Sequence, residues 1–326
     1  KLEAAPPQGR GNTRSLISRL RSGPPPSATE AAQVVEEAMA GDVELESPKE
    51  VTAAISALGA KRFWQLALVL VADSRRKRYV DIIAYNATIK ACERGARWQQ
   101  ALSLLWTARD HDLQRDAITF NTTISACEKG RQWELALVLL QETVMRELSV
   151  DGDVISFSIA ISACEKGRRW DLALALLAEM PSRQIEPDLI SYNTTISACE
   201  KGGYWEWALA LLTRSRRCNL RPDVITYNAA ISACEKGARW ELAMVMLANM
   251  RARRSEPDVI SYSAATSASE NCEKWEEALR VLAEINERTL EPNRISMNAA
   301  ISACEKGVHW EGALLMLGGM QDQRLM

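Results

Sequence analysis

Apolar residues recur at helical spacing in a unit that repeats along most of the chain. In the stretch 189–223, Tyr192 and Ile196 lie four residues apart on one face of a predicted helix. A second apolar stripe includes Trp205 and Leu212, again at helical spacing. Each unit is therefore predicted to be a pair of amphipathic helices, and neither helix buries its apolar face alone.

The tryptophans give the period of the repeat. Trp64 and its seven counterparts follow one another at spacings of 34, 35, 37, 35, 35, 35 and 35 residues. A period in this range over about eight copies predicts helical hairpins stacked in two layers of a right- or left-handed superhelix. The tryptophan is then a packing wedge between hairpins. The predicted units are 48–81, 82–116, 117–153, 154–188, 189–223, 224–258, 259–293 and 294–326.

One stripe of the first helix is not explained by packing. In the unit 189–223 it contains Ile190, Asn193, Ser197 and Lys201, on the side away from the core face. Its aliphatic slot is held by Ile83, Ile118, Ile155, Ile190, Ile225, Ile260 and Ile295. Its polar slot is held by Asn86, Asn121, Ser158, Asn193, Asn228, Ser263 and Asn298. Its cationic slot is held by Arg94, Lys129, Lys166, Lys201, Lys236 and Lys306.

Asparagine and serine are indifferent helix formers, because their side chains compete for backbone hydrogen bonds. An ordinary solvated face would be better served by Lys, Glu or Gln. A repeated amide beside an aliphatic side chain, with a cation one turn further on, suits the edge, face and phosphate of an unpaired base. The stripe therefore favours nucleic-acid recognition over a solvated face.

Composition and charge qualify this picture. The net charge is −2, and a glutamate precedes each cation of the stripe, as Glu200 precedes Lys201. For binding to single-stranded nucleic acid, six such cations predict a plot of log K against log salt concentration with a slope no steeper than about −4. No apolar run approaches the length of a membrane span, so direct membrane insertion is not expected. The units are also nearly identical, which suits a repetitive ligand or a protein scaffold equally well.

The most faithfully repeated segment, "ISACEKG", contains a thiol, an acid and a base without forming a catalytic site. It begins at Ile124 and recurs unchanged at four later positions. Its cysteine falls on the core face of the first helix, where a free cysteine packs like a small apolar residue. The chain has no CxxC, so a zinc or thioredoxin-like site has no support.

Residues 1–47 precede the repeats as an N-terminal extension. The chain starts at Lys1 without a methionine, and up to Thr29 it carries five basic residues and one acid. Scattered serines and the run Pro24 to Pro26 complete this composition. It fits a partly disordered segment beside an organellar transit sequence, and it fits a solvated linker equally well.

The repeat resembles the pentatricopeptide repeat family. The resemblance rests on the 35-residue hairpin, the "ISYN" and "ITYN" openings, the Ala-Leu pair of the second helix and the Pro-Asp ending, and it covers 48–326. It implies modular binding of single-stranded RNA in a plastid or mitochondrion, at one base per repeat. The expected fold class is all-α, a right-handed α-solenoid of stacked helix-turn-helix hairpins.

In that family the base is selected mainly by the polar residue of the stripe and the last residue of the same unit. The resemblance thus implies U for Asn86 with Asp116, Asn121 with Asp153, Asn193 with Asp223 and Asn228 with Asp258. It implies G for Ser158 with Asp188, and A for Ser263 with Asn293. The predicted core ligand is 5′-UUGUUA-3′, while Asn298 has no partner in the chain. Thr52 with Asp81 would add a G, but Lys49 replaces the aliphatic there.

The carboxylates of these pairs have a second explanation. Asp116 or Asp223 stands directly before the next helix, where it would serve as an N-cap without any RNA. Ser263 and Asn293 argue mildly against capping alone, because both slots change in the same unit.

Catalysis is not expected. His309-Trp310-Glu311 matches the first half of the zinc deaminase signature, but no second half follows, and other units have Arg-Trp-Glu in these slots. No phosphate loop, metal cluster or cofactor motif is present, so no cofactor is predicted. Two functions remain open. One is an organellar RNA-binding adaptor in RNA processing, stability or translation, and the other is a non-catalytic scaffold subunit of a large organellar complex.

Overall fold

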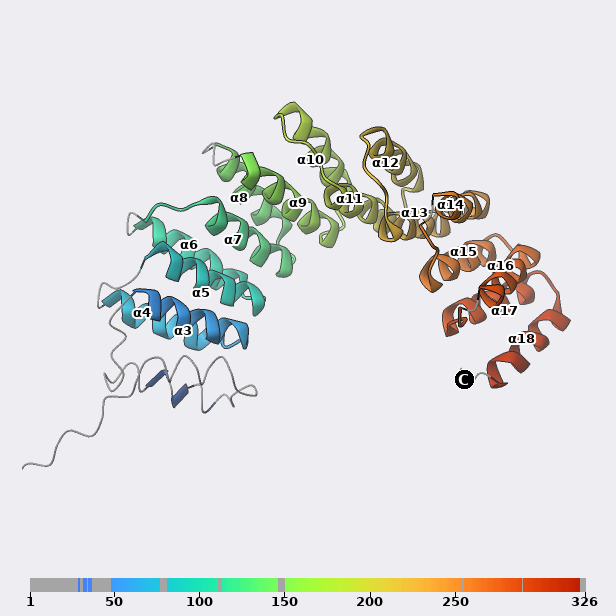
Figure 1. Cartoon of the computed structure of the whole chain (residues 1–326), viewed down its shortest axis with the longest axis horizontal. Coiled ribbons are helices and arrows are strands. Elements are labelled where there is room, and N and C mark those ends of the chain that lie inside the picture. Colours follow the sequence, from blue (N-terminus) through green and yellow to red (C-terminus); the bar gives the residue numbers. More distant parts are fainter. Residues whose placement is uncertain are drawn as a thin grey trace, which may run out of the picture. The chain divides into compact units, whose positions relative to one another are not determined.

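The chain is helical throughout its described repeats. The computed structural model describes residues 48–76, 81–110, 113–145, 150–253, 255–288 and 290–322, together with residues 29, 32, 33, 35 and 36. Two compact units, Lys1–Ala163 and Cys164–Met326, are treated separately below. They divide within α9 (Val150–Lys166). Figure 1 shows the order of the helices along the chain.

In each of the two compact units, the first and second helices of successive repeats alternate along the chain. The first unit contains α3 (Pro48–Ala60), α4 (Trp64–Arg76), α5 (Ile82–Arg94), α6 (Trp98–Asp110), α7 (Ala117–Lys129) and α8 (Trp133–Met145). The second unit contains α10 (Trp170–Ser182), α11 (Leu189–Gly202), α12 (Trp205–Arg217), α13 (Val224–Lys236), α14 (Trp240–Ala252), α15 (Val259–Asn271), α16 (Trp275–Glu287), α17 (Arg294–Lys306) and α18 (Trp310–Asp322). Odd numbers mark first helices and even numbers mark second helices.

The first helices begin where an acidic or amide side chain caps them. The side chain of Asp223 accepts a hydrogen bond from the backbone N–H of Thr226 at 2.9 Å, which satisfies one of the free donors at the start of α13. The same cap is formed by Asp81, Asp116, Asp188, Asp258 and Asn293. The capping role considered for these residues is therefore present in the fold.

The hairpins stack through their first helices. In the first unit α5 contacts α3, α6 and α7, and in the second unit α13 contacts α11, α14 and α15. Second helices also contact the first helix that follows them, as α6 contacts α7 and α12 contacts α13. This pattern is the stacking of a helical-repeat solenoid, so the predicted all-α fold class is confirmed, while the handedness of the superhelix stays a prediction.

The tryptophan at the start of a second helix packs against the end of the next first helix in five of the repeats, those of Trp64, Trp98, Trp170, Trp205 and Trp275. A Cβ added to Gly237, the last residue of "ISACEKG", would lie 2.2 Å from Cδ1 of Trp205. The same close approach joins Gly95 to Trp64 and Gly307 to Trp275. The tryptophan is therefore the packing wedge that the sequence predicts.

This contact also revises the interpretation of the glycine. Gly237 has a φ of −82°, and the left-handed residue is Ala238, with a φ of 51°. Among the helices that the structure describes, only α11 ends on a left-handed glycine, Gly203 with a φ of 80°. The glycine of the heptapeptide thus serves close packing, and the turn conformation falls on the residue after it.

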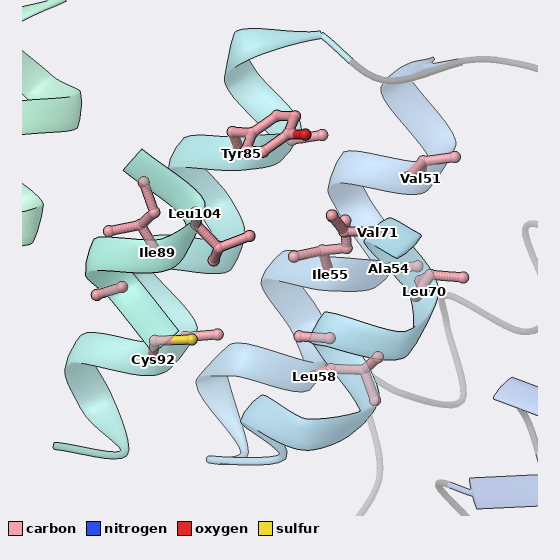
Figure 2. Packing of buried hydrophobic residues seen from close by; sticks show 14 of the residues in the cluster. Val51, Ala54, Ile55, Leu58, Leu70, Val71, Tyr85, Ile89, Cys92 and Leu104 are labelled. Carbon is pink, nitrogen blue, oxygen red and sulfur yellow. The ribbon is translucent and has the colours of Figure 1, made fainter. Parts of the chain in front are cut away.

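The core follows the predicted apolar face. Figure 2 shows Ile55, Leu58, Tyr85, Ile89 and Cys92 packed together between α3, α4, α5 and α6. The cysteine slot is fully buried in Cys92, Cys127, Cys164, Cys199, Cys234 and Cys304. Burial raises the pKa of Cys92, Cys127 and Cys199 to about 12, so these groups are neutral thiols. The structural interpretation of the cysteines is confirmed.

The N-terminal extension predicted for 1–47 lies almost entirely outside the described residues. Among those that are described, Val35 is buried in the core cluster of the first unit, with Val51 and Leu70. At least this part of the N-terminal segment therefore contributes to the solenoid core.

Candidate nucleic-acid interface

Within each of the two compact units, the isoleucines of the stripe form a row of exposed apolar side chains. Six of them lie at the second residue of a first helix, and Ile155 lies further along α9, which begins earlier, at Val150. Their exposed fractions lie between 55% and 66% for Ile83, Ile118, Ile155, Ile190, Ile225, Ile260 and Ile295. A single exposed isoleucine is ordinary, but an aliphatic in the same exposed slot of successive repeats is not explained by packing.

The polar residue of the stripe lies against the last residue of its unit. Asn193 Nδ2 donates to Asp223 Oδ1 at 3.2 Å, across the hairpin that separates them in sequence. Asn86 donates to Asp116 at 3.3 Å, and Asn228 donates to Asp258 at 3.1 Å. We call these three contacts the amide–carboxylate pairs.

The repeat 259–293, in which Ser263 replaces the stripe asparagine, also brings its two predicted residues together. Ser263 Oγ lies 3.0 Å from Asn293 Oδ1, to which it donates, and 2.6 Å from the carbonyl oxygen of Val259. Residues predicted from sequence to act together thus lie within hydrogen-bond distance in this unit too. Asn293 at the same time caps α17.

The remaining predicted positions are less completely placed. Asn121 lies on α7 and accepts a hydrogen bond from Ser156, whereas the side chain of its predicted partner, Asp153, lies outside the described residues. Ser158 belongs to the first unit and Asp188 to the second, where Asp188 caps α11. Asn298 is exposed on α17.

Hydrogen bonds favour the ionised form of the Asp223 carboxylate. Burial of Asp223 opposes its ionisation, but hydrogen bonds from the backbone and hydroxyl of Thr226 and from the Asn193 amide outweigh this effect and lower the pKa. A lowered pKa means that Asp223 is a hydrogen-bond acceptor at neutral pH. The stripe therefore presents donors and acceptors side by side at the start of the first helices.

The cations of the stripe are held by glutamates of the preceding repeat. Lys236 Nζ lies 2.6 Å from Glu200 Oε1, and Lys129 Nζ lies 2.7 Å from Glu93 Oε1. The same ion pair joins Lys201 to Glu165 and Lys306 to Glu270. The sequence pointed to the glutamate adjacent in sequence as the group that tempers each cation, but the carboxylate that forms the ion pair lies one repeat earlier.

The serine of the heptapeptide joins this contact. Ser125 donates to Glu93 at 3.0 Å, and Ser197 donates to Glu165 at 2.6 Å, each reaching the oxygen that also binds the lysine. Hydrogen bonds from Lys129 and Lys90 lower the pKa of Glu93, although its burial acts in the opposite direction. The Ser, Glu and Lys of "ISACEKG" thus form one contact between stacked repeats.

One stripe cation, Arg94, differs from this arrangement. Arg94 is exposed and has no ion pair with any residue that the structure describes, because Gly59 occupies the place of the glutamate one repeat earlier. Lys166 is also exposed, at the end of α9. Among the described residues, Arg94 therefore has no carboxylate partner that would compete with an anionic ligand.

One set of polar contacts was missed in the sequence. The third residue of the first helix is Thr119, Thr226 or Ser261, for which the pattern of the sequence predicts no polar contact. Its hydroxyl reaches the stripe asparagine of the preceding repeat, as Thr226 Oγ1 reaches Asn193 Oδ1 at 2.6 Å. The signal in the sequence was the recurrence of a hydroxyl in a buried slot of unit after unit.

The deaminase-like triplet has a packing role. His309 stacks on Trp275 with ring centroids 4.1 Å apart, and its Nδ1 accepts a hydrogen bond from the backbone N–H of Gly312. No three His, Cys, Asp or Glu side chains of the described residues gather as a metal-binding group. Among the described helices, none has both the length and the apolar character needed to cross a bilayer.

Several family models match the repeats. The PPR repeat family matches residues 152–201, the pentatricopeptide repeat domain matches 210–271 and 245–306, and the PPR repeat matches 118–148 and 190–220. The chain belongs to the pentatricopeptide repeat family. No curated protein sequence matches it.

Solved structures of the same family share the fold. The pentatricopeptide repeat protein PPR10 from maize has a TM-score of 0.78 and 22% identity, over 96% of this chain and 44% of PPR10. PPR10 in complex with an 18-nt psaJ RNA element has a TM-score of 0.74 and 22% identity, over 97% of this chain and 46% of that chain. The chain spans less than half the length of these relatives.

Proposed function

We propose that the chain is an organellar adaptor that binds single-stranded RNA and reads about one base per repeat. It would act in RNA processing, stability or translation and would carry out no reaction itself. The observation that carries this proposal is the row of exposed isoleucines beside the amide–carboxylate pairs. Packing explains neither the exposed aliphatic row nor its regular placement beside hydrogen-bonding groups.

The chemistry of the row suits an unpaired base. Exposed side chains such as Ile190 and Ile225 offer apolar contact to the faces of a base. The amide and carboxylate beside them offer hydrogen bonds to its edge. The family membership and the fold shared with PPR10, which has been crystallised with RNA, add support to this proposal.

The base assignments transfer from the family pattern. Reading from the pair of Asn86 to that of Ser263, the proposed ligand is 5′-UUGUUA-3′. The fourth base, a U, would be read by Asn193 with Asp223. Changing Asn193 to Ser is expected to move the preference at that base from U toward G, and an unchanged preference would show that this code does not operate here.

Phosphate contacts are expected to be weaker than the number of stripe cations suggests. Each ion-paired lysine, such as Lys236 with Glu200, must share or exchange its carboxylate to reach a phosphate. Arg94 is free of this competition among the described residues. We therefore expect the affinity for RNA to fall with salt less steeply than the slope of about −4 that six free cations would give.

A gel-shift titration tests the proposal. The full chain is titrated against 5′-UUGUUA-3′ and against its complement, 5′-UAACAA-3′, at two salt concentrations. We expect tighter binding of the first RNA at both. Equal and weak affinity for the two RNAs would exclude sequence reading.

A specific observation favours a second candidate function, a scaffold within a large organellar complex. The stripe lysines are neutralised by glutamates, and the whole chain has a net charge of −2, which leaves little attraction for phosphate. In this case the exposed isoleucines would contact a protein. The same titration separates the two functions, because a scaffold does not distinguish the RNA from its complement.

A further inference from the structure

The hydroxyl at the third residue of a first helix lies between two polar groups of the preceding repeat. Thr226 Oγ1 is 2.6 Å from Asn193 Oδ1 and 2.7 Å from Asp223 Oδ1. Thr119 Oγ1 is 2.7 Å from both Asn86 Oδ1 and Asp116 Oδ1. Two further hydroxyls reach the amide oxygen in the same way, Ser156 to Asn121 and Ser261 to Asn228.

These contacts determine which way the amide points. The hydroxyl is a donor to the amide oxygen, and the carboxylate accepts from the amide nitrogen at 3.2 Å in the pair of Asn193 and Asp223. A flipped Asn193 would place its oxygen against an ionised carboxylate with no proton between them. The hydroxyl and the carboxylate together therefore hold one amide orientation.

The amide so held offers a donor beside an acceptor. One N–H of Asn193 is used by Asp223, and the second remains for a ligand. On the carboxylate, Oδ1 receives all the hydrogen bonds described for Asp116 and Asp223, and Oδ2 receives none from the described residues. A free N–H next to a free carboxylate oxygen is the complement of a carbonyl next to a ring N–H.

This array discriminates between bases. Uracil and guanine carry a carbonyl beside a ring N–H on the Watson–Crick edge. Cytosine and adenine have an unprotonated ring nitrogen there, which would face the carboxylate and be repelled. A freely rotating amide would weaken this distinction, because its oxygen would then accept from the amino group of cytosine or adenine and offset the repulsion at the ring nitrogen.

The repeat 259–293, which has a serine in place of the stripe asparagine, differs in this contact from the repeats just described. Its stripe residue is Ser263, which has no amide to orient, and the hydroxyl of the following repeat, Ser296, turns instead to the backbone carbonyl of Asn293 at 2.9 Å. In that unit the contact to the preceding stripe residue is absent from the described hydrogen bonds. The hydroxyl-to-amide contact thus accompanies an asparagine in the stripe.

We propose that Thr119, Ser156, Thr226 and Ser261 are positioning residues that orient the reading asparagine of the repeat before them. Each unit then reads its base with the help of its neighbour. This inference rests on the proposed RNA binding and deepens it, because it assigns the choice between uracil and cytosine to a third residue.

The test exchanges one hydroxyl for a methyl group. Thr226→Val preserves the shape of the side chain and removes the donor to Asn193. Binding is measured for 5′-UUGUUA-3′, for 5′-UUGCUA-3′ with the fourth base changed, and for 5′-UUGUCA-3′ with the fifth base changed. The wild-type chain is expected to prefer U over C at each position by about tenfold, the worth of one net hydrogen bond.

The variant is expected to lose the preference only at the fourth base, to less than about threefold. Ser261→Ala provides the mirror experiment, since Ser261 contacts Asn228, which reads the fifth base. Thr226→Ser should restore the wild-type preference. Thr195→Val is the matched control, because the buried hydroxyl of Thr195 donates to the carbonyl of Ser191 and does not contact a stripe asparagine.

The outcomes separate this inference from the proposed function. A wild-type chain that does not distinguish the RNAs contradicts the proposed function. It also contradicts the inference, which depends on that function. A wild-type chain that prefers U, with a Thr226→Val variant that still prefers U at the fourth base, overturns the inference alone. An equal loss of affinity for all three RNAs also overturns it, because that result indicates a merely structural hydroxyl in the cap of α13.

Discussion

Two neighbouring joints of the second unit use different chemistry at the ends of their first helices. Where α13 stacks on α11, Lys236 forms an ion pair with Glu200, and Gly237 lies under Trp205. Where α15 stacks on α13, the lysine and glycine slots hold Asn271 and Cys272. Asn271 donates to the backbone carbonyl of Glu235 at 3.1 Å, and Cys272 donates to that of Ala238 at 3.2 Å. We call these the regular joint and the substituted joint.

The comparison shows which contacts stacking requires. Side chains that cap the carbonyls at the end of α13 replace the ion pair, so the glutamate–lysine contact is one of two workable solutions. At the other end of the first helices the two joints agree. Asn193 with Asp223 and Asn228 with Asp258 form the same pair, each with a hydroxyl from the next repeat. The change in contact type thus lies at the end that holds the heptapeptide, whereas at the other end Ser261 replaces Thr226 and forms the same contact.

The largest predicted effect is on the glycine of the regular joint. Gly237→Ala places a Cβ 2.2 Å from Trp205, so the ring must move. We expect a loss of about 2 kcal/mol in the free energy of unfolding, measured by urea denaturation. Cys272→Ala is the matched control in the substituted joint, where a Cβ is already accommodated, and it should change stability little. Equal effects of the two changes would contradict the packing role of the glycine.

An exchange of core residues between the joints comes next. Cys234 and Ser269 hold the same fully buried slot in α13 and α15. Burial raises the pKa of Cys234 to about 11, so it is an apolar thiol at neutral pH, whereas Ser269 must donate to the carbonyl of Ala265. Cys234→Ser should cost about 1 kcal/mol, and Ser269→Cys should stabilise by a similar amount. The thermal unfolding midpoints of the two variants should move in opposite directions. A shift of both midpoints in the same direction would contradict the assigned roles of the two side chains.

Substitutions in the turn after a first helix are expected to have a smaller effect on the free energy of unfolding. Ala238 has a φ of 51°, a left-handed conformation that favours glycine, and Gly203 holds the corresponding place after α11. Ala238→Gly should stabilise by about 0.5 kcal/mol, because relief of strain exceeds the added freedom of the unfolded chain. Gly203→Ala should destabilise by about 1 kcal/mol. Chemical denaturation of both variants checks the opposite signs.

The smallest predicted effect restores the ion pair of the substituted joint. Glu235 lacks the lysine that its counterparts have, and its pKa is raised by burial, opposed by Lys236 and reinforced by Glu200 and Glu270. Asn271→Lys should stabilise by about 0.5 kcal/mol at neutral pH. This net stabilisation is what the new ion pair contributes, less what is lost with the Asn271 hydrogen bond.

The pH dependence of that gain identifies Glu235 as its origin. Because the folded pKa is raised, ionising Glu235 destabilises the wild type as pH rises from the unfolded value of about 4.3 through the folded value. The added lysine offsets this loss, so the difference between variant and wild type should grow across that window and vanish below it. A difference independent of pH would assign the effect to another group. Asn271→Gln, which keeps the amide, is the control.

Much of the fold could be predicted from the residues of one unit. The spacing of Tyr192, Ile196 and Cys199 placed the core face, and the structure buries all three. Asp223 was recognised both as a cap and as a partner of Asn193, and it forms both contacts. These predictions succeed because helical periodicity and capping depend on residues close in sequence.

The contacts between repeats could not be predicted in the same way. Lys236 was considered beside its sequence neighbour, Glu235, yet it pairs with Glu200, which lies 36 residues earlier. The hydroxyl of Thr226 had no predicted polar role, yet it donates to the amide oxygen of Asn193. Which of two chemically suitable partners a side chain reaches depends on the stagger between stacked hairpins, and periodicity within one unit carries no information about that stagger.

The amino-acid sequence by itself thus determined the period, the two helices of each unit, their buried faces and the exposed stripe, because each follows from local spacing along a helix. The tertiary structure decided the rest. It showed that the lysines are neutralised, that the glycine makes room for a tryptophan, and that each stripe asparagine is held by the following repeat. These features depend on how one hairpin lies on the next, since only stacking brings groups 30 to 36 residues apart within hydrogen-bond distance.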